Sequence, residues 1–382
     1  MDNLINLLAV EPSGLWEKLI LIFNGGFASF ALSIIILTIC IKVVMLPLDF
    51  FNKYISQKNM IQQQELAPEL EKIKKRCKNN KQKEQEETAK LYKQKNINPM
   101  GSCLFMLVNL ALTLTIFITL LNGLNAMSAF RIQNQYEELQ IAYVQQYALD
   151  NKGDDVYKII EENNKKSDDD ETKLTIQQIV APYISEINEI TDESTKSSVL
   201  ETANKNVSER YEQVKDNFLW IDNIWLSDTP FNSSIPTFDQ YAGVARLSDE
   251  QKADENAKTT YNQIMDPLRE TNGRANGYFV LTVLTAVCAF LNQWLMTRKQ
   301  RKQLQGSSAP AVGSGKFMLV FMPLFMAFFS LMYTSMFSLY LVTSQLVSIA
   351  TVPLINLIVR KVMEHKKNKN NKINPTNRMR RI

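Results

Sequence analysis

Long stretches without a charged residue alternate along this chain with strongly polar ones. The charge-free runs are residues 19–41, 96–130, 275–297 and 317–359. A hydrocarbon core about 30 Å thick is crossed by roughly 20 helical residues, and each run is long enough. The pattern therefore predicts an integral membrane protein and argues against a soluble one.

The last charge-free run is too long for one crossing. As a single helix, residues 317–359 would measure about 65 Å, twice the thickness of the bilayer core. We therefore predict two spans separated by a turn in the polar cluster 334–338. The complete set of predicted spans is 27–48, 100–123, 277–297, 317–333 and 339–359.

The polar stretches also carry helical periodicity. Residues 49–99 place apolar side chains at helical spacing on both sides of a break at 78–80, which predicts two antiparallel helices projecting from the membrane. The long segment 124–276 has the same spacing and predicts a small helical domain, with a loop at 164–172 and an apolar patch at 218–225 that should lie against the membrane surface. Residues 1–26 predict a helix lying in the membrane interface.

Charge sets the direction of the spans. The net charge of +4 hides segregated blocks. Segments 49–99, 298–316 and 360–382 are basic, whereas 1–26 and 124–274 are acidic. Alternation across five spans puts the three basic segments on one side, and the positive-inside rule makes that side the cytoplasm. We expect the N-terminus outside and the C-terminus in the cytoplasm, without a cleaved signal peptide.

Composition removes most catalytic chemistry. The single histidine, His365, lies in the Lys-rich tail, which argues against His-based catalysis and His-ligated metal sites. No cysteine lies between 104 and 287, so the polar middle holds no disulfide. Residues 313–316 lack the spacing of a phosphate-binding loop, and Asp168–Asp170 lacks alternating calcium ligands. We expect no enzyme activity, no cofactor and no metal.

Several motifs make the sequence recognisable. Residues 41–48 (IKVVMLPL) lead into 66–73 (LAPELEKI), followed by 90–93 (KLYK) and 97–104 (INPMGSCL). Weaker matches are 218–220, Asn292–Gln293 and 338–340. Together they resemble the YidC/Oxa/Alb family of membrane protein insertases, in the five-span form typical of Gram-positive bacteria.

The resemblance implies an all-α polytopic fold. Five transmembrane helices would enclose a hydrophilic groove open to cytoplasm and lipid, with a cytoplasmic helical hairpin that recruits substrates. It implies a plasma-membrane insertase and chaperone for nascent membrane proteins, acting alone or beside the SecYEG translocon, without nucleotide or metal. The acidic segment 124–276 is an enlarged extracytoplasmic insertion, far longer than the family's usual connection, and we expect a solvated lid or a partner-binding domain there.

Lys42 is the only charged residue in any predicted span. It can snorkel to the cytoplasmic interface near Asp49, or it can lie in a wet groove and attract polar parts of a substrate. Its position matches the groove arginine of the family, which favours the second interpretation. Other polar residues in the spans are candidates for the same groove, or for ordinary interhelical hydrogen bonds: Thr38, Asn109, Thr113, Asn292 and Gln293.

The basic tail 360–382 leaves three alternatives open. It can contact ribosomal RNA through salt-dependent attraction to phosphates, bind anionic lipid headgroups, or only fix the topology. For the whole chain, the alternatives to an insertase are a secondary transporter or channel and an extracytoplasmic sensor. A transporter would normally show intramembrane carboxylates and inverted repeats, and a sensor would need an output domain after the last span.

Overall fold

The structure is a computed structural model that describes residues 13–77, 80–95, 99–166, 172–304 and 314–373. These residues are mostly helical, with two isolated β-bridges and no strand among them. Three helical segments of this part are long and apolar enough to cross a membrane: Phe30–Asn59, Leu110–Lys152 and Ser335–Lys366. Val280–Met296 and Leu319–Met332 are shorter apolar helices. The prediction of an all-α membrane protein is confirmed, and each predicted span overlaps one of these helices.

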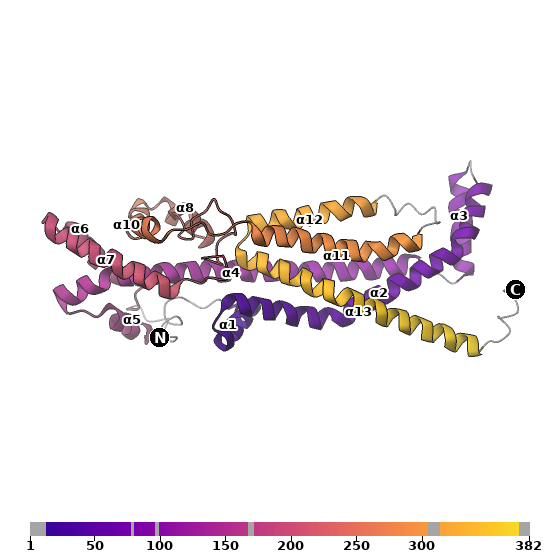
Figure 1. The fold of residues 1–382 in the computed structure, drawn as a ribbon, viewed down its shortest axis with the longest axis horizontal. Helices are drawn as coiled ribbons and strands as arrows, with labels where there is room; N and C mark the ends of the chain where they lie inside the picture. Colours follow the sequence, from indigo (N-terminus) through magenta and orange to yellow (C-terminus); the bar gives the residue numbers. More distant parts are fainter. Residues whose placement is uncertain (1–12, 78–79, 96–98, 167–171, 305–313, 374–382) are drawn as a thin grey trace. The chain divides into compact units, whose positions relative to one another are not determined.

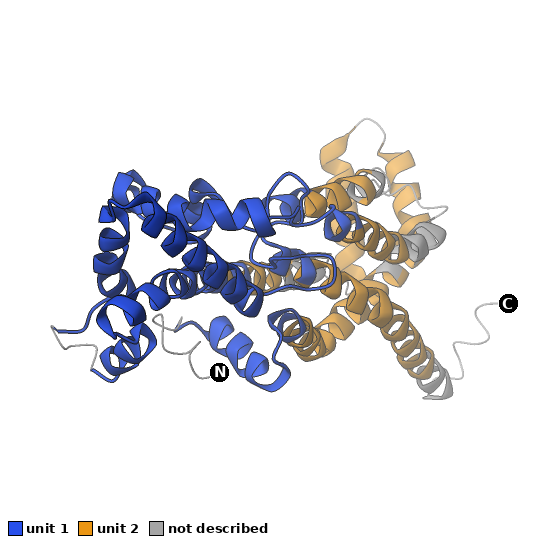
Figure 2. Ribbon diagram, turned by 60° about the vertical axis from the view of Figure 1, so that its left-hand side comes forward, with its two compact units in different colours: residues 1–34, 120–283, 328–339 blue, residues 35–119, 284–327, 340–382 orange. Residues whose placement is uncertain are grey.

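The chain divides into two compact units (Figure 2). Unit 1 contains residues 1–34, 120–283 and 328–339, and unit 2 contains residues 35–119, 284–327 and 340–382. The dividing points lie inside helices, because the long helices contribute one end to each unit. The two units are described separately below.

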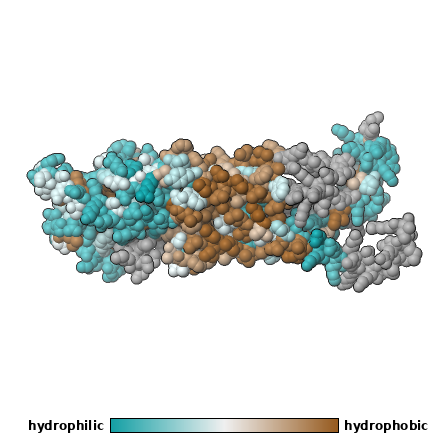
Figure 3. All heavy atoms as spheres, viewed as in Figure 1, coloured by the Kyte–Doolittle hydropathy of each residue, from teal (hydrophilic) through white to brown (hydrophobic). Residues whose placement is uncertain are grey.

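Within the described residues, unit 2 consists of α3 and of parts of five longer helices (Figure 1). They are most of α2 (Phe30–Arg76), α3 (Lys81–Gln94), the first part of α4 (Pro99–Lys152), and most of α11 (Val280–Leu304), α12 (Ser314–Met332) and α13 (Ser335–Ile373). Many of their apolar side chains are exposed, among them Val44, Val108 and Leu324. Hydrophobic residues gather on the surface over α11 and α12 (Figure 3), as expected for helices whose solvent is lipid.

Helices α2 and α3 form a hairpin in unit 2, where two antiparallel helices were predicted. Helix α2 continues without interruption from the first span to Arg76, and α3 begins at Lys81. Asn80 caps α3, because its side chain accepts a hydrogen bond from the Lys83 backbone N–H at 3.1 Å. The two helices share a small core of buried side chains: Leu66, Ile73, Cys77 and Leu91. The pattern of apolar spacing therefore predicted both helices and the break between them.

Unit 1 holds the large polar segment. It contains α1 (Leu15–Phe27), the second part of α4, α5 (Val156–Asn164), α6 (Ile176–Glu189), α7 (Glu193–Val214), α8 (Phe238–Val244), α9 (Asp249–Ala253) and α10 (Glu255–Asn272). The periodic apolar positions that predicted this domain face its core, as Leu139, Tyr143 and Val180 do. Capping boxes begin α6, α8 and α9, which explains why these short helices start where they do.

Helix α4 crosses the predicted boundary between the second span and this domain. It runs as one helix from Pro99 to Lys152, so the second predicted span and the first helix of this domain are one continuous helix (Figure 1). Gly123 lies buried at this transition, and a Cβ there would be 2.7 Å from the Cβ of Trp16 on α1. The glycine is needed because the two helices approach so closely.

We expect Gly123→Ala to lower the free energy of unfolding by about 1–2 kcal/mol, because overpacking forces the Trp16 side chain to shift. Chemical unfolding in detergent, followed by circular dichroism, measures this. Gly243→Ala is the matched control: it lies in α8 with nothing within 4 Å of the added Cβ. Equal stability of the two variants would contradict the close-packing argument.

Two sequence-based predictions were wrong in detail. The stretch 218–225 is not a patch on the membrane surface, because Ile221, Ile224 and Trp225 are buried within unit 1 and only Leu219 is strongly exposed. An apolar run alone does not distinguish a lipid-facing surface from a protein core. The turn before the last span is also shorter than predicted, because α12 ends at Met332 and α13 begins at Ser335.

Parts of several other predictions lie outside the described residues. They are residues 1–12 of the interfacial helix, 78–79 of the predicted break, 167–171 of the predicted loop at 164–172, 305–313 of the predicted loop at 298–316, and the last part of the basic tail from 374 onward. The described part of the first segment is α1, and α5 ends at Asn164, where the loop was expected to begin.

Candidate functional site

Lys42 lies on α2 in unit 2, half-buried against α13. Its Nζ donates a hydrogen bond to Ser348 Oγ at 3.2 Å, and that hydroxyl in turn donates to the Ser344 carbonyl at 2.8 Å. No carboxylate among the described residues forms a salt bridge with Lys42. A charged amine held by one neutral hydroxyl keeps unused donor capacity, since an ammonium group carries three N–H donors.

Two of the other predicted groove residues also lie in the interior of unit 2. They are Thr38 on α2 and Asn292 on α11. Thr38 is fully buried on α2, one turn before Lys42. Asn292 on α11 donates from Nδ2 to Gln345 Oε1 on α13 at 2.7 Å, while its own Oδ1 is buried and has no hydrogen-bond partner among the described residues. Polar side chains from α2 and α11 thus meet residues of α13, which is what a polar seam inside a helical bundle requires.

For the remaining candidates the structure gives helix and burial. Gln293 is half-buried on α11, and Thr113 on α4 is exposed. Asn109 lies on α4, but its side chain lies outside the described residues. For Asn292, the observed contact is the interhelical hydrogen bond that was the alternative to a role in the groove.

Sequence reasoning missed the contribution of α13. Gln345 and Ser348 accept hydrogen bonds from Asn292 and Lys42, and Asn356 has a buried Oδ1 with no partner in the part of the chain that the structure describes. A usable signal was present, because Gln345 and Ser348 are three residues apart in a charge-free run and therefore lie on the same helix face.

A second polar cluster lies in unit 1, where α11 begins and where α12 meets α13. Thr282 and Ser330 hydroxyls are 3.2 Å apart, and Ser330 donates to Ser338 Oγ at 2.8 Å. All three side chains are buried. They form a closed chain of interhelical hydrogen bonds, as polar side chains in packed membrane helices commonly do.

The loop between α7 and α8 caps the first turns of two spans. Asp228 is 2% exposed, and its carboxylate accepts the backbone N–H groups of Tyr278 at 2.9 Å and Leu281 at 2.6 Å. The carbonyl of Leu226 accepts the N–H of Ser335 at 2.8 Å, where α13 begins. Helix N-termini leave such backbone donors unpaired. A carboxylate placed there also interacts favourably with the positive end of the helix dipole.

A buried ion pair holds this loop on α4. Trp225 is fully buried and packs edge-on against Phe30 with ring centroids 5.2 Å apart. Its indole N–H donates to Asp216 Oδ2 at 2.6 Å, and the same carboxylate pairs with Arg131 at 2.9 Å. Because tryptophan and ion pair share one acceptor, the loop has a fixed seat next to the capped helix ends.

No group of three or more His, Cys, Asp or Glu residues in the described ranges could hold a metal ion. The side chains of Lys42, Asn292, Gln345 and Ser348 offer hydrogen-bond donors, acceptors and one positive charge among apolar helices.

Comparison with known proteins decides the family. A family profile described as "60Kd inner membrane protein" matches residues 22–365, which is most of the chain. The chain belongs to this family. The resemblance to the YidC/Oxa/Alb insertases is thereby confirmed, and with its apolar helices this member of the family is a multi-pass protein of the plasma membrane.

Individual relatives are similar over shorter stretches. The chain is 41% identical over 96 residues to "Membrane protein insertase YidC" of Fusobacterium nucleatum, which is 25% of this chain and 45% of that protein. It is 37% identical over 132 residues to the protein of the same name from Clostridium tetani, which is 34% of this chain and 57% of that protein. For the relative from Alcanivorax borkumensis, the match is 36% over 106 residues and spans only 18% of its length. No solved structure matches the chain significantly.

Proposed function

We propose that this chain is a membrane protein insertase, which receives newly made membrane proteins and passes their apolar segments into the lipid. The family supports this proposal, since the matched relatives bear the name insertase. The observation that carries it in this chain is Lys42, the one charge in the predicted spans, whose Nζ donates to Ser348 of α13 and forms no salt bridge among the described residues, although Asp49 is near enough to attract it electrostatically.

The mechanism that we propose needs no bond-making. Polar groups of a substrate tail find no partners in hydrocarbon, so crossing about 30 Å of it is prohibitive. A polar recess with one positive charge shortens that barrier and stabilises an acidic or polar tail partway across. The apolar segment of the substrate then moves sideways into lipid, which releases about 0.8 kcal/mol per buried CH₂ group.

Reconstitution tests this function directly. The purified chain is placed in liposomes, and protease-protected insertion of a short single-span substrate with an acidic tail is measured against empty liposomes. We expect insertion above the empty control. A second series contains SecYEG, because the family acts alone or beside that channel. Absence of insertion in both series would contradict the proposal.

For the orientation, we propose that the basic segments 49–99, 298–316 and 360–382 face the cytoplasm. On this basis the hairpin of α2 and α3 is the first part of the chain that a cytoplasmic substrate meets. Its charged surface carries exposed ion pairs such as Lys95–Glu69 at 2.8 Å, while its core among the described residues holds a few apolar side chains. A lightly built hairpin of this kind suits transient contact with many substrates.

The basic tail is proposed to contact ribosomes. Helix α13 continues to Ile373, and Lys366 donates to the Tyr54 hydroxyl of α2 at 2.9 Å, which anchors the start of the tail. We expect deletion of 367–382 to weaken co-sedimentation with ribosomes at least tenfold at low salt, since it removes most of the tail's positive charges. Undiminished co-sedimentation would leave lipid binding or topology as the role of the tail, and liposomes with and without anionic lipid separate those two.

A further inference from the structure

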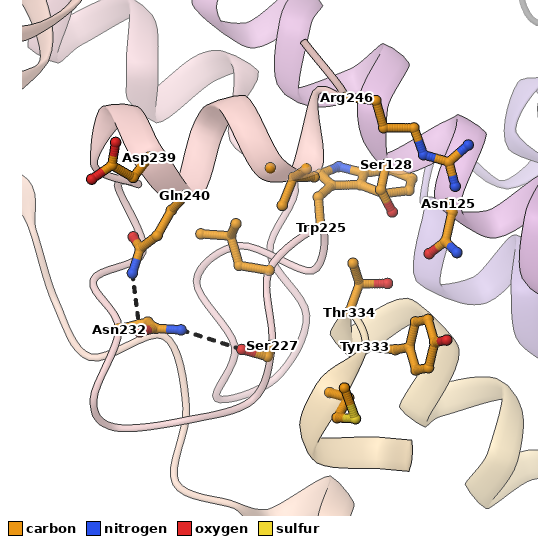
Figure 4. A pocket seen from close by; sticks show the side chains of 14 residues that line it. Asn125, Ser128, Trp225, Ser227, Asn232, Asp239, Gln240, Arg246, Tyr333 and Thr334 are labelled. Atoms are coloured by element: carbon orange, nitrogen blue, oxygen red, sulfur yellow. Dashed lines mark hydrogen bonds between the residues drawn. The ribbon is translucent and has the colours of Figure 1, made fainter. Parts of the chain in front are cut away.

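Unit 1 contains a cavity of about 420 Å³ that the proposed insertase mechanism does not use. It is lined by residues of α4, of the loop between α7 and α8, and of α8 with Arg246 just after it. The end of α12 and the turn before α13 complete the lining (Figure 4). Cavities of this size accept small ligands or the headgroup of a larger one.

The polar groups on one wall of the cavity satisfy each other. Gln240 donates to Asn232 Oδ1 at 3.0 Å, and Asn232 donates to Ser227 Oγ at 3.4 Å (Figure 4). The carboxylate of Asp239 also lies on this side, so an anion is disfavoured there. This wall therefore presents few open donors to a ligand.

The other wall presents donors without partners. Exposed Arg246 and half-buried Asn125 extend their side chains on the same side of the cavity (Figure 4), and no hydrogen bond or ion pair joins either side chain to another described residue. Thr334 is 9% exposed, and its buried Oγ1 has no hydrogen-bond partner. Buried polar atoms are rarely left unpaired, and Thr334 lines the cavity, so a rotation of its side chain toward the cavity would give the hydroxyl a partner there.

The backbone at Arg246 strengthens this point. Its φ is 57°, in the left-handed region, directly after α8, where the N–H of Leu247 bonds the Ala242 carbonyl at 3.1 Å. Glycine is the usual residue at such a helix end, and a residue with a Cβ costs roughly 1 kcal/mol more. The arginine thus occupies a position where glycine would be more stable, which is expected if its side chain has a task.

Apolar side chains lead away from the cavity along the last turns of α12. Met332 lines the cavity and is 65% exposed, and Phe328 and Leu331 beside it are 56% and 45% exposed. A ligand that joins an anionic group to hydrocarbon chains matches both features, because guanidinium groups bind phosphate through paired N–H donors.

We propose that this cavity binds the phosphate of a membrane phospholipid headgroup between Arg246, Asn125 and Thr334, with the acyl chains lying along Phe328–Met332 of α12. The source of the phosphate is a lipid of the bilayer rather than free phosphate, because the exposed apolar residues continue the site toward the membrane. The site is separate from the contacts of Lys42 with Ser348 and of Asn292 with Gln345. It does not depend on the proposed insertase activity.

The test measures binding to the full-length chain in detergent by thermophoresis. The probes are dioctanoyl phosphatidylglycerol, a dioctanoyl glycerol with the same chains but no phosphate, and inorganic phosphate. We expect the phospholipid to bind at least tenfold more tightly than either other probe. Equal binding of the dioctanoyl glycerol would overturn the proposal in favour of an unspecific apolar surface. Equal binding of inorganic phosphate would overturn it in favour of a site for free anions.

Variants make the assignment to this cavity. We expect Arg246→Gly to weaken phospholipid binding at least tenfold while the unfolding temperature stays equal to or above that of the unchanged chain, because glycine suits the backbone there. Arg246→Lys should lose only two- to fivefold, and Thr334→Val should lose a similar amount. Arg274→Gln removes an exposed arginine of unit 1 outside the cavity and should leave binding unchanged. Unchanged affinity in Arg246→Gly would refute the site.

Discussion

Replacing Lys42 by alanine is expected to reduce insertion of a substrate with an acidic tail about tenfold. The variant removes the one positive charge of the predicted spans, and a contribution of about 1.4 kcal/mol to holding the tail corresponds to that factor. Initial rates of protease-protected insertion into liposomes give the comparison. Lys42→Arg should retain most of the activity, since attraction of a polar tail needs the charge and not a particular donor geometry.

Two controls separate charge from position. A substrate with an uncharged tail should insert at nearly the same rate into liposomes that carry the unchanged chain or the Lys42→Ala variant, because it gains little from the amine. Ser348→Ala removes the hydroxyl that holds Nζ and leaves the charge, so a loss below threefold is expected. If both Lys42 variants insert the acidic substrate at the unchanged rate, Lys42 has no part in the mechanism and only snorkels.

Removing the carboxylate of Asp228 is expected to cost about 3 kcal/mol of unfolding free energy. Asp228→Ala leaves two backbone donors unpaired, the buried N–H of Leu281 in the first turn of α11 and the part-buried N–H of Tyr278 just before it, and charge-assisted hydrogen bonds of this kind contribute about 1.5–3 kcal/mol each. Chemical unfolding in detergent micelles, followed by circular dichroism, measures the difference.

The chain offers a matched control in Asp239, an exposed carboxylate of the same unit. Asp239→Ala should change the unfolding free energy by less than about 0.5 kcal/mol, as is usual for surface positions. Asp228→Asn should fall between the two, because the amide keeps one acceptor oxygen and loses the charge. If Asp228→Ala is as stable as Asp239→Ala, the capping argument fails.

The position of Asp228 also bears on the enlarged polar segment. The loop between α7 and α8 belongs to that segment, yet it supplies the caps for α11 and α13 and buries Trp225 between α4 and α2 residues of unit 1. The segment therefore stabilises the N-terminal ends of α11 and α13 through these hydrogen bonds. Its role as a lid or as a partner-binding domain stays a prediction.

Local pattern determined much of this protein. The charge-free runs predicted each long apolar helix, because the free energy of burying an apolar stretch in lipid depends on its length and composition alone. The helical spacing of Leu66, Ile73 and Leu91 predicted the hairpin, and the spacing around Leu139 and Val180 predicted the core of unit 1. The motifs at 41–48 and 97–104 were sufficient for the family.

Tertiary structure decided the contacts between distant residues. Lys42 and Ser348 are 306 positions apart, and Asp228 caps a helix that begins more than 50 residues later; no periodicity encodes such pairs. Trp225 lies in an apolar stretch that looked suited to the membrane surface, and only the shared acceptor Asp216 and the packing on Phe30 place it in a protein core. Hydrophobicity drives a side chain out of water, but the chain's other segments decide whether it meets lipid or protein.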